Sequence, residues 1–205
     1  MPNYQLFEKG QELTKAAKAL ILLHGRGGAA GDILPLANEF CDNQFYVAAL
    51  QAPNNIWYPQ SFMAEDQLNE PYLTYSVEAI KKLLDEIGRH IPKSQIYLMG
   101  FSQGACLSLE VSSRYAEKLG GVIAFTGGLI GQTIDETRYK GDFAGTKVFI
   151  GNGDEDPYIP LERSKQSKVV MEKLGANVTL NVYTGRKHII SKNEKIWVKE
   201  NILII

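Results

Sequence analysis

The sequence predicts an α/β protein with a mainly parallel central sheet and helices on both of its faces. Two observations support this fold class: short apolar runs of strand length recur along the chain, and helix-like segments lie between them. Strands that alternate with helices are joined by crossover connections, which place neighbouring strands parallel. The length of 205 residues and the hydrophobic content of 44% suit one compact domain, residues 1–205.

The predicted strands are continuous apolar runs. The first, residues 18–24, ends in glycines and is typical of a strand buried on both faces. Five further runs have strand length and carry β-branched or aromatic residues, and they cover residues 45–50, 95–99, 121–125, 147–150 and 177–183. The pattern therefore indicates six strands, which the helices between them would join into a mainly parallel sheet.

The clearest helix is predicted across residues 73–91, where apolar residues are spaced alternately four and three apart. This apolar face should cover one side of the sheet. Further helices are expected after Asp32, after Ser102, across 160–174 and after Ser191, which has capping-box spacing to Glu194. Residues 51–71 show no periodicity, and a loop of that length in a compact domain is more often functional than idle.

Composition argues against several classes of function. The formal net charge is -1, from 22 basic and 23 acidic residues that are interspersed, so neither a nucleic-acid nor a membrane-surface binder is indicated. The sequence shows no secretory leader pattern and no run of membrane-spanning length, which predicts a cytoplasmic location. Cys41 and Cys106 lie among apolar neighbours and are expected to be free thiols. No metal-ligand spacing occurs, so no metal is expected.

Residues 100–104, Gly-Phe-Ser-Gln-Gly, match the GxSxG pattern between a predicted strand and a predicted helix. In such a sharp strand-to-helix turn the serine takes a strained backbone conformation, and the flanking glycines allow close packing of the chain. Ser102 would then lie above the carboxyl end of its strand, at a helix N-terminus that favours developing negative charge. A simple tight turn is the alternative, and the position between strand and helix favours a nucleophile.

A serine nucleophile needs a base, and histidine is the usual one because its ordinary pKa lies near neutral pH. The chain has three histidines. His90 closes the long predicted helix, where a solvated structural role suits it. His24 ends the first strand before a run of glycines, which favours a role in shaping a loop. His188 lies in a short loop between the last predicted strand and the last predicted helix, so elimination favours His188.

In proteins whose nucleophilic serine lies in a GxSxG turn between a strand and a helix, the acid that orients the histidine lies between the serine and the histidine along the chain. Asp154, Glu155 and Asp156 all follow the predicted strand 147–150. Spacing alone does not choose among the three. Ordinary turn chemistry would also place carboxylates there.

Stabilising a tetrahedral oxyanion needs two backbone N–H donors, one from the residue after the nucleophile and one from a loop after an earlier strand. Gln103 is the first candidate. Arg26, in the glycine-rich loop 24–28, is the second. A phosphate-binding loop is the rival interpretation of these glycines, but the Walker spacing with its lysine and the full GxGxxG pattern are both missing.

These motifs together resemble the phospholipase/carboxylesterase family of α/β-hydrolases, which includes small bacterial carboxylesterases and acyl-protein thioesterases. The resemblance extends over nearly the whole chain and rests on HGRGG at 24–28, AP at 52–53, WY at 57–58, GFSQG at 100–104, GDEDPYIP at 153–160 and GRKH at 185–188. It implies the α/β-hydrolase fold and no cofactor. The chain is short for the family, which leaves no obvious room for a large lid domain.

The resemblance also implies roles for individual residues. The family pattern of Asp-Pro, an aliphatic residue and Pro falls on residues 156–160, which implies that Asp156 is the triad acid. Ser102 and His188 match the nucleophile and the base, and the backbones of Arg26 and Gln103 match the oxyanion hole. The thioesterase branch usually has an acid at position 28, where this chain has glycine, so the likeness favours the small bacterial carboxylesterase branch.

The leading hypothesis is a serine carboxylesterase, a carboxylic ester hydrolase that acts on small esters through an acyl-enzyme on Ser102. An acyl thioesterase or lysophospholipase with the same triad is one alternative, and a non-catalytic relative that binds a small ligand is an alternative from another class. Trp57 and Tyr58 either line the substrate pocket or anchor their loop against the sheet. The expected partner is a small ester, and small enzymes of this fold often form homodimers.

Overall fold

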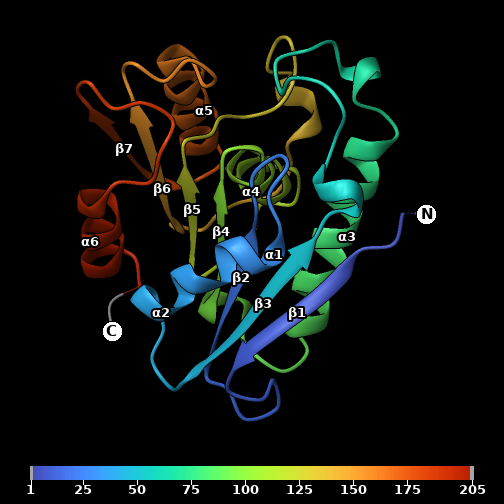
Figure 1. Cartoon of the computed structure of the whole chain (residues 1–205), viewed down its shortest axis with the longest axis vertical. Helices are drawn as coiled ribbons and strands as arrows, with labels where there is room; N and C mark the ends of the chain where they lie inside the picture. The colour runs from blue at the N-terminus through green and yellow to red at the C-terminus, as the bar shows by residue number, and fades with distance from the viewer. Residues whose placement is uncertain (1, 204–205) are drawn as a thin grey trace.

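The computed structural model describes residues 2–203, and across them seven strands form a sheet in the order β1-β3-β2-β4-β5-β6-β7. The first strand, β1 (Gln5–Gly10), pairs antiparallel with β3, and every other pairing is parallel. Figure 1 shows the parallel strands with their carboxyl ends toward the top of the view. The predicted fold class, a mainly parallel sheet between helices without a large lid, is confirmed.

Six strands lie where the apolar runs predict them: β2 (Lys18–Leu23), β3 (Phe45–Gln51), β4 (Ile96–Phe101), β5 (Gly121–Phe125), β6 (Lys147–Gly153) and β7 (Asn177–Tyr183). No apolar run in the sequence predicts β1. All six residues of β1 are exposed, so this edge strand carries no run of apolar residues that would reveal it. β1 extends the sheet beyond β3, on the side away from β7.

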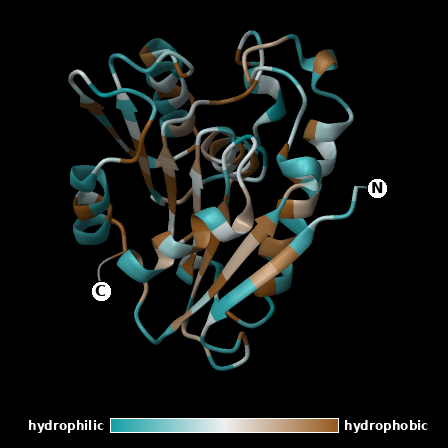
Figure 2. Ribbon diagram, viewed as in Figure 1, coloured by the Kyte–Doolittle hydropathy of each residue, from teal (hydrophilic) through white to brown (hydrophobic). Residues whose placement is uncertain are grey.

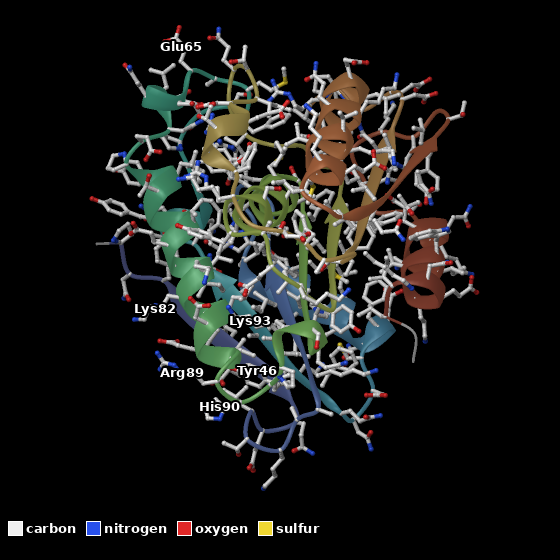
Figure 3. The ribbon with its side chains drawn as sticks, turned by 180° about the vertical axis from the view of Figure 1, so that it is seen from behind. Tyr46, Glu65, Lys82, Arg89, His90 and Lys93 are labelled. Carbon is white, nitrogen blue, oxygen red and sulfur yellow. The ribbon has the colours of Figure 1, made fainter. Side chains whose placement is uncertain are left out.

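The helices form two layers, and Figures 1 and 3 view the molecule from opposite sides. One apolar core joins the sheet to α1 (Ala30–Ile33), α2 (Ala37–Phe40) and α6 (Lys192–Asn201). The other core joins it to α3 (Tyr72–Ile87), α4 (Gln103–Arg114) and α5 (Leu161–Lys173). Short 3-10 helices complete the structure: η1 (Leu34–Leu36), η2 (Pro53–Asn55), η3 (Asp66–Leu68), η4 (Lys93–Gln95) and η5 (Glu136–Arg138).

The strands alternate their side chains between these two cores, as a sheet covered on both faces requires. Along β2, Leu20 and Leu22 enter the core with α1, whereas Ile21 and Leu23 enter the core with α3. Figure 2 accordingly shows hydrophobic colours along the central strands and hydrophilic colours on the outer helix surfaces. No helix in the described part of the chain is long and apolar enough to cross a membrane.

Two predicted helix boundaries are informative. The capping box is present: the Ser191 hydroxyl accepts the Glu194 N–H, and the Glu194 carboxylate accepts the Ser191 N–H at 2.7 Å. The long helix α3, by contrast, ends at Ile87 rather than near residue 91, and Gly88 follows it. His90 therefore lies in the turn beyond the helix and does not close it: its N–H donates to the Ile87 carbonyl at 3.0 Å, three residues back instead of the four of an α-helix.

Candidate active site

Ser102 lies in the turn between β4 and α4, and its backbone is strained. Its φ is 55° and its ψ is -117°, a conformation that L-residues rarely adopt. A Cβ placed on Gly100 would lie 2.2 Å from the Gly104 carbonyl oxygen, and one on Gly104 would lie 2.1 Å from that of Leu23. Both glycines are thus required by close approach of backbone, which holds the serine hydroxyl out from the turn.

The structure brings three predicted residues from separate loops into one hydrogen-bonded chain. The Ser102 hydroxyl donates to His188 Nε2, with 2.7 Å between Oγ and Nε2. The other imidazole nitrogen, Nδ1, donates to Asp156 Oδ2 at 2.8 Å. Since a carboxylate can only accept, the proton on the imidazole is on Nδ1 and the lone pair on Nε2 faces the serine. This arrangement suits proton transfer from the serine to the histidine.

Asp156 is the one carboxylate of its loop that faces the histidine. Its side chain is fully buried, and its second oxygen, Oδ1, accepts the backbone N–H groups of Tyr158 at 2.8 Å and Ile159 at 3.0 Å. Asp154 is exposed and accepts the Gly185 N–H at 2.7 Å, so it fastens the base of the histidine loop. Glu155 is exposed as well. The geometry therefore distinguishes three acids that spacing alone leaves equivalent.

The other two histidines lie elsewhere. His24 is buried, and its Nδ1–H donates to the Gly25 carbonyl at 2.7 Å while Nε2 accepts the Ala52 N–H at 3.1 Å. Burial lowers the pKa of His24, which keeps it neutral and suits the loop-shaping role. His90 is exposed at the opposite end of the molecule from the Ser102 turn, where Figure 3 labels it below α3.

The glycine-rich loop 24–28 lies against the Ser102 turn. A Cβ placed on Gly25 would lie 3.4 Å from the Ser102 Cβ, so the two segments are in contact. Across residues 2–203, the backbone N–H groups of Arg26 and Gln103 donate to no other protein group. Gln103 is the first residue of α4, where backbone N–H groups lack helical partners and the dipole favours an anion. Both N–H groups thus remain available to a ligand.

The side chains of Arg26 and Gln103 have a second role that sequence reasoning missed. The Arg26 guanidinium donates to the carbonyls of Pro59 at 2.8 Å and Tyr58 at 3.0 Å, and also to that of Gln60. The Gln103 amide accepts the Trp57 N–H at 3.1 Å and donates to the Tyr58 carbonyl at 2.8 Å. These two side chains tie loop 57–60 to the segments that carry Ser102. No local pattern signals such bonds, since the partners are more than 30 positions apart.

A cavity of about 490 Å³ opens beside Ser102. Its walls come from the loops at the carboxyl ends of the strands, and the residues that line it are Arg26, Tyr58, Pro59, Gln60, Ser61, Phe62, Ser102, Gln103, Cys106, Tyr158, Ile159 and His188. A cavity of this volume suits a small organic ligand. The rings of Phe101 and Tyr158 flank the His188 ring at centroid distances of 5.1 and 4.9 Å, and of these two only Tyr158 lines the cavity.

Trp57 and Tyr58 differ in their relation to the cavity beside Ser102. Trp57 is fully buried, its indole Nε1–H donates to the His24 carbonyl at 2.8 Å, and it is not among the residues that line the cavity beside Ser102. Of the two roles expected for Trp57, this geometry favours anchoring of the loop, because the side chain is buried and bonded to the His24 carbonyl. Tyr58 is also buried, yet it does contribute to the cavity wall.

The two cysteines are free thiols, as expected. Cys106 lies at the cavity wall, where burial raises its pKa to about 12, so it stays a protonated thiol at neutral pH. Among the described residues, no group of three or more histidine, cysteine or carboxylate side chains could hold a metal ion.

Comparison with known proteins shows the family to which the chain belongs. The phospholipase/carboxylesterase family matches residues 9–204. The crystal structure of a phospholipase/carboxylesterase from Dyadobacter fermentans is 45% identical with a TM-score of 0.96, and the match covers 98% of this chain and 97% of that one. The carboxylesterase of Bacillus cereus is 26% identical with a TM-score of 0.74, covering 98% and 92% of the two chains.

Curated relatives include acyl-protein thioesterase 1 of Debaryomyces hansenii, which is 36% identical over 58% of this chain. That match covers 53% of the yeast protein, so the chain spans about half the length of this relative. A probable carboxylesterase of Oryza sativa is 29% identical, with 89% of this chain and 77% of the rice protein covered. With the family match over nearly all its residues, the chain belongs to the phospholipase/carboxylesterase family of α/β-hydrolases.

Proposed function

We propose that this chain is a serine carboxylesterase that hydrolyses small carboxylic esters, with Ser102 as nucleophile, His188 as base and Asp156 as the acid that orients it. The observation that carries the proposal is the continuous hydrogen-bonded chain from Ser102 through His188 to Asp156 at the wall of a cavity. An unassisted serine hydroxyl is a poor nucleophile, and such a chain is the usual means of activating it.

In the acylation step, the Ser102 oxygen forms a bond to the ester carbonyl carbon while its proton passes to His188 Nε2. The tetrahedral intermediate then collapses, the bond to the alcohol oxygen breaks, and the histidine returns the proton to the leaving alcohol. In the deacylation step, water repeats the sequence on the acyl-enzyme. Asp156 stays ionised throughout and holds Nδ1–H, so that Nε2 keeps facing the reacting atoms.

The oxyanion of each intermediate needs donors that are already in place. The backbone N–H groups of Arg26 and Gln103 are the donors in this proposal, since both lie beside Ser102 and neither is used by another protein group in the described residues. Donors of this kind act where charge develops, so each contributes about 10²- to 10³-fold to kcat. The mechanism requires no metal ion and no cofactor.

An acyl thioesterase or lysophospholipase is the second candidate, and it is favoured by the likeness to acyl-protein thioesterase 1 of D. hansenii. The same triad would serve, because a thioester carbonyl accepts the same attack. The two candidates differ in the length of acyl chain that the site must hold. A non-catalytic ligand binder is disfavoured, since such a protein has no need to hold three reactive groups at bonding distance.

The proposal is tested by labelling the serine with a fluorophosphonate probe, which reacts with activated serines, alongside turnover of p-nitrophenyl butyrate. Ser102→Ala should abolish both labelling and turnover while the circular dichroism spectrum stays unchanged. Ser94→Ala is the matched control, because Ser94 is an exposed serine in η4, before the amino end of β4. Labelling that survives in Ser102→Ala would refute the proposal.

A further inference from the structure

A buried ion pair lies behind the histidine loop and is not used by the mechanism above. The Arg186 guanidinium donates through Nη1 to Glu194 Oε2, and the side chains are 6% and 0% exposed. Arg186 lies two residues before His188, and Glu194 lies in the first turn of α6, six residues after it. The pair thus bridges the two ends of the segment that carries His188.

The remaining contacts of the pair hold the chain on the far side of His188. Arg186 Nη1 also donates to the carbonyl of Ile189, the residue directly after His188, at 2.7 Å. Glu194 Oε2 accepts the N–H of Ser191 at 2.7 Å and its hydroxyl at 3.0 Å. The backbone around His188 is therefore tied at positions 186, 189 and 191, which restricts the direction of the imidazole.

The same pair packs directly on β6, whose carboxyl end leads to Asp156. A Cβ on Gly153 would lie 1.9 Å from the Arg186 carbonyl oxygen, and one on Gly151 would lie 2.1 Å from Glu194 Oε1. Arg186 Nη2 adds a bond to the Thr126 hydroxyl at 3.3 Å, directly after β5. The loop with the base is thus pressed against the strand that leads to the acid.

Burying this ion pair is unfavourable for the stability of the fold. Within residues 2–203, Arg186 Nε and Glu194 Oε1 are buried without a hydrogen-bond partner. Burial also raises the pKa of Glu194, which reflects the unfavourable desolvation of its charge. Buried ion pairs that are not fully hydrogen-bonded are often no better for stability than apolar side chains of similar size. We therefore look for the role of Arg186 and Glu194 in the position of the His188 loop.

We propose that Arg186 and Glu194 are positioning residues, which hold the loop of His188 so that its imidazole lies within bonding distance of both Ser102 and Asp156. The inference rests on the serine esterase mechanism and adds two residues that act through His188 without touching the substrate. It assigns Glu194 a role beyond the capping of α6. A displacement of about 1 Å at the base costs on the order of 100-fold in rate, so the pair should affect kcat strongly.

The decisive variant is Arg186→Met combined with Glu194→Gln. Methionine fills the space of the arginine stem, and glutamine can still accept the Ser191 N–H, so the helix cap remains and no charge is left buried alone. We expect the urea midpoint to stay near that of the parent, kcat for p-nitrophenyl butyrate to fall by about 10- to 100-fold and KM to change less than about twofold. A kcat within about twofold of the parent overturns the proposal.

Arg186→Lys serves as a second variant if the double variant fails to fold. A lysine keeps a positive charge opposite Glu194, yet its single ammonium cannot reproduce the planar fork that reaches Glu194, Ile189 and Thr126 together. We expect at least about a fivefold loss of kcat in a folded protein, and parent kcat would refute positioning. The control is Lys195→Met with Glu39→Met, which removes a partly exposed ion pair between the side chains of α6 and α2, leaves the backbone bonds of α6 in place and should leave kcat unchanged.

A measurement that does not depend on turnover separates this proposal from the proposed function. The Nδ1 proton of His188, hydrogen-bonded to Asp156, should give a low-field NMR resonance, to be assigned by its loss in His188→Gln. In the double variant or in Arg186→Lys this resonance should weaken or shift upfield, whereas in the control with Lys195→Met and Glu39→Met it should stay in place. An unchanged resonance overturns positioning even if the parent is active. If the resonance changes in the variants but the parent has no esterase activity, the positioning role stands and the proposed function is refuted.

Discussion

Asp154 and Asp156 lie two residues apart in one loop, and their surroundings assign them different tasks. The Asp156 carboxylate is fully buried and accepts Nδ1–H of His188, whereas Asp154 is exposed and accepts the N–H of Gly185. Asp156→Asn should lower kcat by about 10⁴-fold, because the amide can donate to Nδ1 and then favours the wrong imidazole tautomer.

Asp154→Asn is the matched comparison for this prediction. It keeps an oxygen that can accept the Gly185 N–H, so kcat should fall by less than about tenfold. The measurement is steady-state turnover of p-nitrophenyl butyrate by both purified variants. If Asp154→Asn proves to be the inactive one, the assignment of the acid is wrong.

His24 makes the stability of the protein depend on pH. Burial lowers its pKa below the ordinary value of 6.5, so between the lowered pKa and 6.5 the unfolded chain binds more protons than the folded one. The free energy of unfolding contributed by neutral His24 is therefore complete above pH 6.5 and is lost as the pH falls from 6.5 through the lowered pKa. The urea midpoint of the parent should drop between about pH 7.5 and about pH 5.5.

The variant that tests this origin is His24→Gln, whose side chain does not titrate. Its stability should be lower at neutral pH, since it loses packing against Trp57, and its urea midpoint should depend less on pH than that of the parent. Other titrating groups are common to both proteins and cancel in the comparison. His90→Gln, at an exposed position, should show the full slope of the parent; equal slopes in all three proteins would exclude His24 as the source.

At the scale of structural elements, the position of loop 57–60 is held by hydrogen bonds from segments that are distant in the sequence. Arg26 and Gln103 bind its carbonyls and the N–H of Trp57, and the Trp57 indole is fastened to the His24 carbonyl. The loop is thus clamped against the same two segments that are proposed to form the oxyanion hole. The position of the cavity wall then follows from the backbone of this loop rather than from the tryptophan ring.

Trp57→Phe tests the anchoring role of the indole. Phenylalanine retains most of the apolar contact but lacks Nε1–H and leaves the His24 carbonyl buried without that donor, so the free energy of unfolding should fall by about 1–3 kcal/mol. KM for p-nitrophenyl acetate should change less than about twofold, because Trp57 does not line the cavity. Urea unfolding and steady-state kinetics measure the two effects. A higher KM with unchanged stability would mean that the ring contacts the substrate.

For the whole molecule, the parallel sheet determines where the site can lie. Ligands of open α/β sheets bind beyond the carboxyl ends of the strands, and Ser102, Asp156 and His188 all lie in loops at that end. No large lid covers this end in the described structure, and its cavity of about 490 Å³ is built from short loops. We expect such a cavity to hold a small acyl group and to leave the remainder of a long chain in water.

We therefore expect kcat/KM to be higher for p-nitrophenyl acetate or butyrate than for the palmitate ester. Each methylene that is buried contributes about 0.8 kcal/mol, and methylenes outside the cavity contribute little. Activity against the series, measured below the micelle concentration of each ester, checks this. A preference for palmitate would favour the thioesterase or lysophospholipase alternative.

The structure indicates where a long chain would have to go in that case. A second hollow, of about 560 Å³, is lined by Met63 and Pro160, the direct neighbours of Phe62 and Ile159 in the wall of the first. Phe62 lines the first hollow and its ring packs against Arg163, which lines the second. Phe62→Ala should then improve turnover of the palmitate ester relative to the butyrate ester, because it removes the ring between these two walls. An unchanged ratio would mean that the hollows act separately.

The sequence by itself determined the features that depend on local patterns. Six strands, the principal helices and the glycine-flanked turn at Ser102 follow from hydrophobic periodicity and turn chemistry, which act over a few neighbouring residues. The capping box at Ser191 is of the same kind. Choosing Asp156 among Asp154, Glu155 and Asp156 needed the family resemblance, since three acids in one turn look alike to any local rule.

Only the tertiary structure decided which distant groups meet. The edge strand β1 has no hydrophobic pattern because it is exposed, and its place beside β3 appears only once the sheet is assembled. The clamps from Arg26 and Gln103 on loop 57–60, and the bond from Arg186 to Glu194, join side chains to groups that no spacing rule connects. Long polar side chains reach in many directions, and the direction they take is set by how the loops pack against one another.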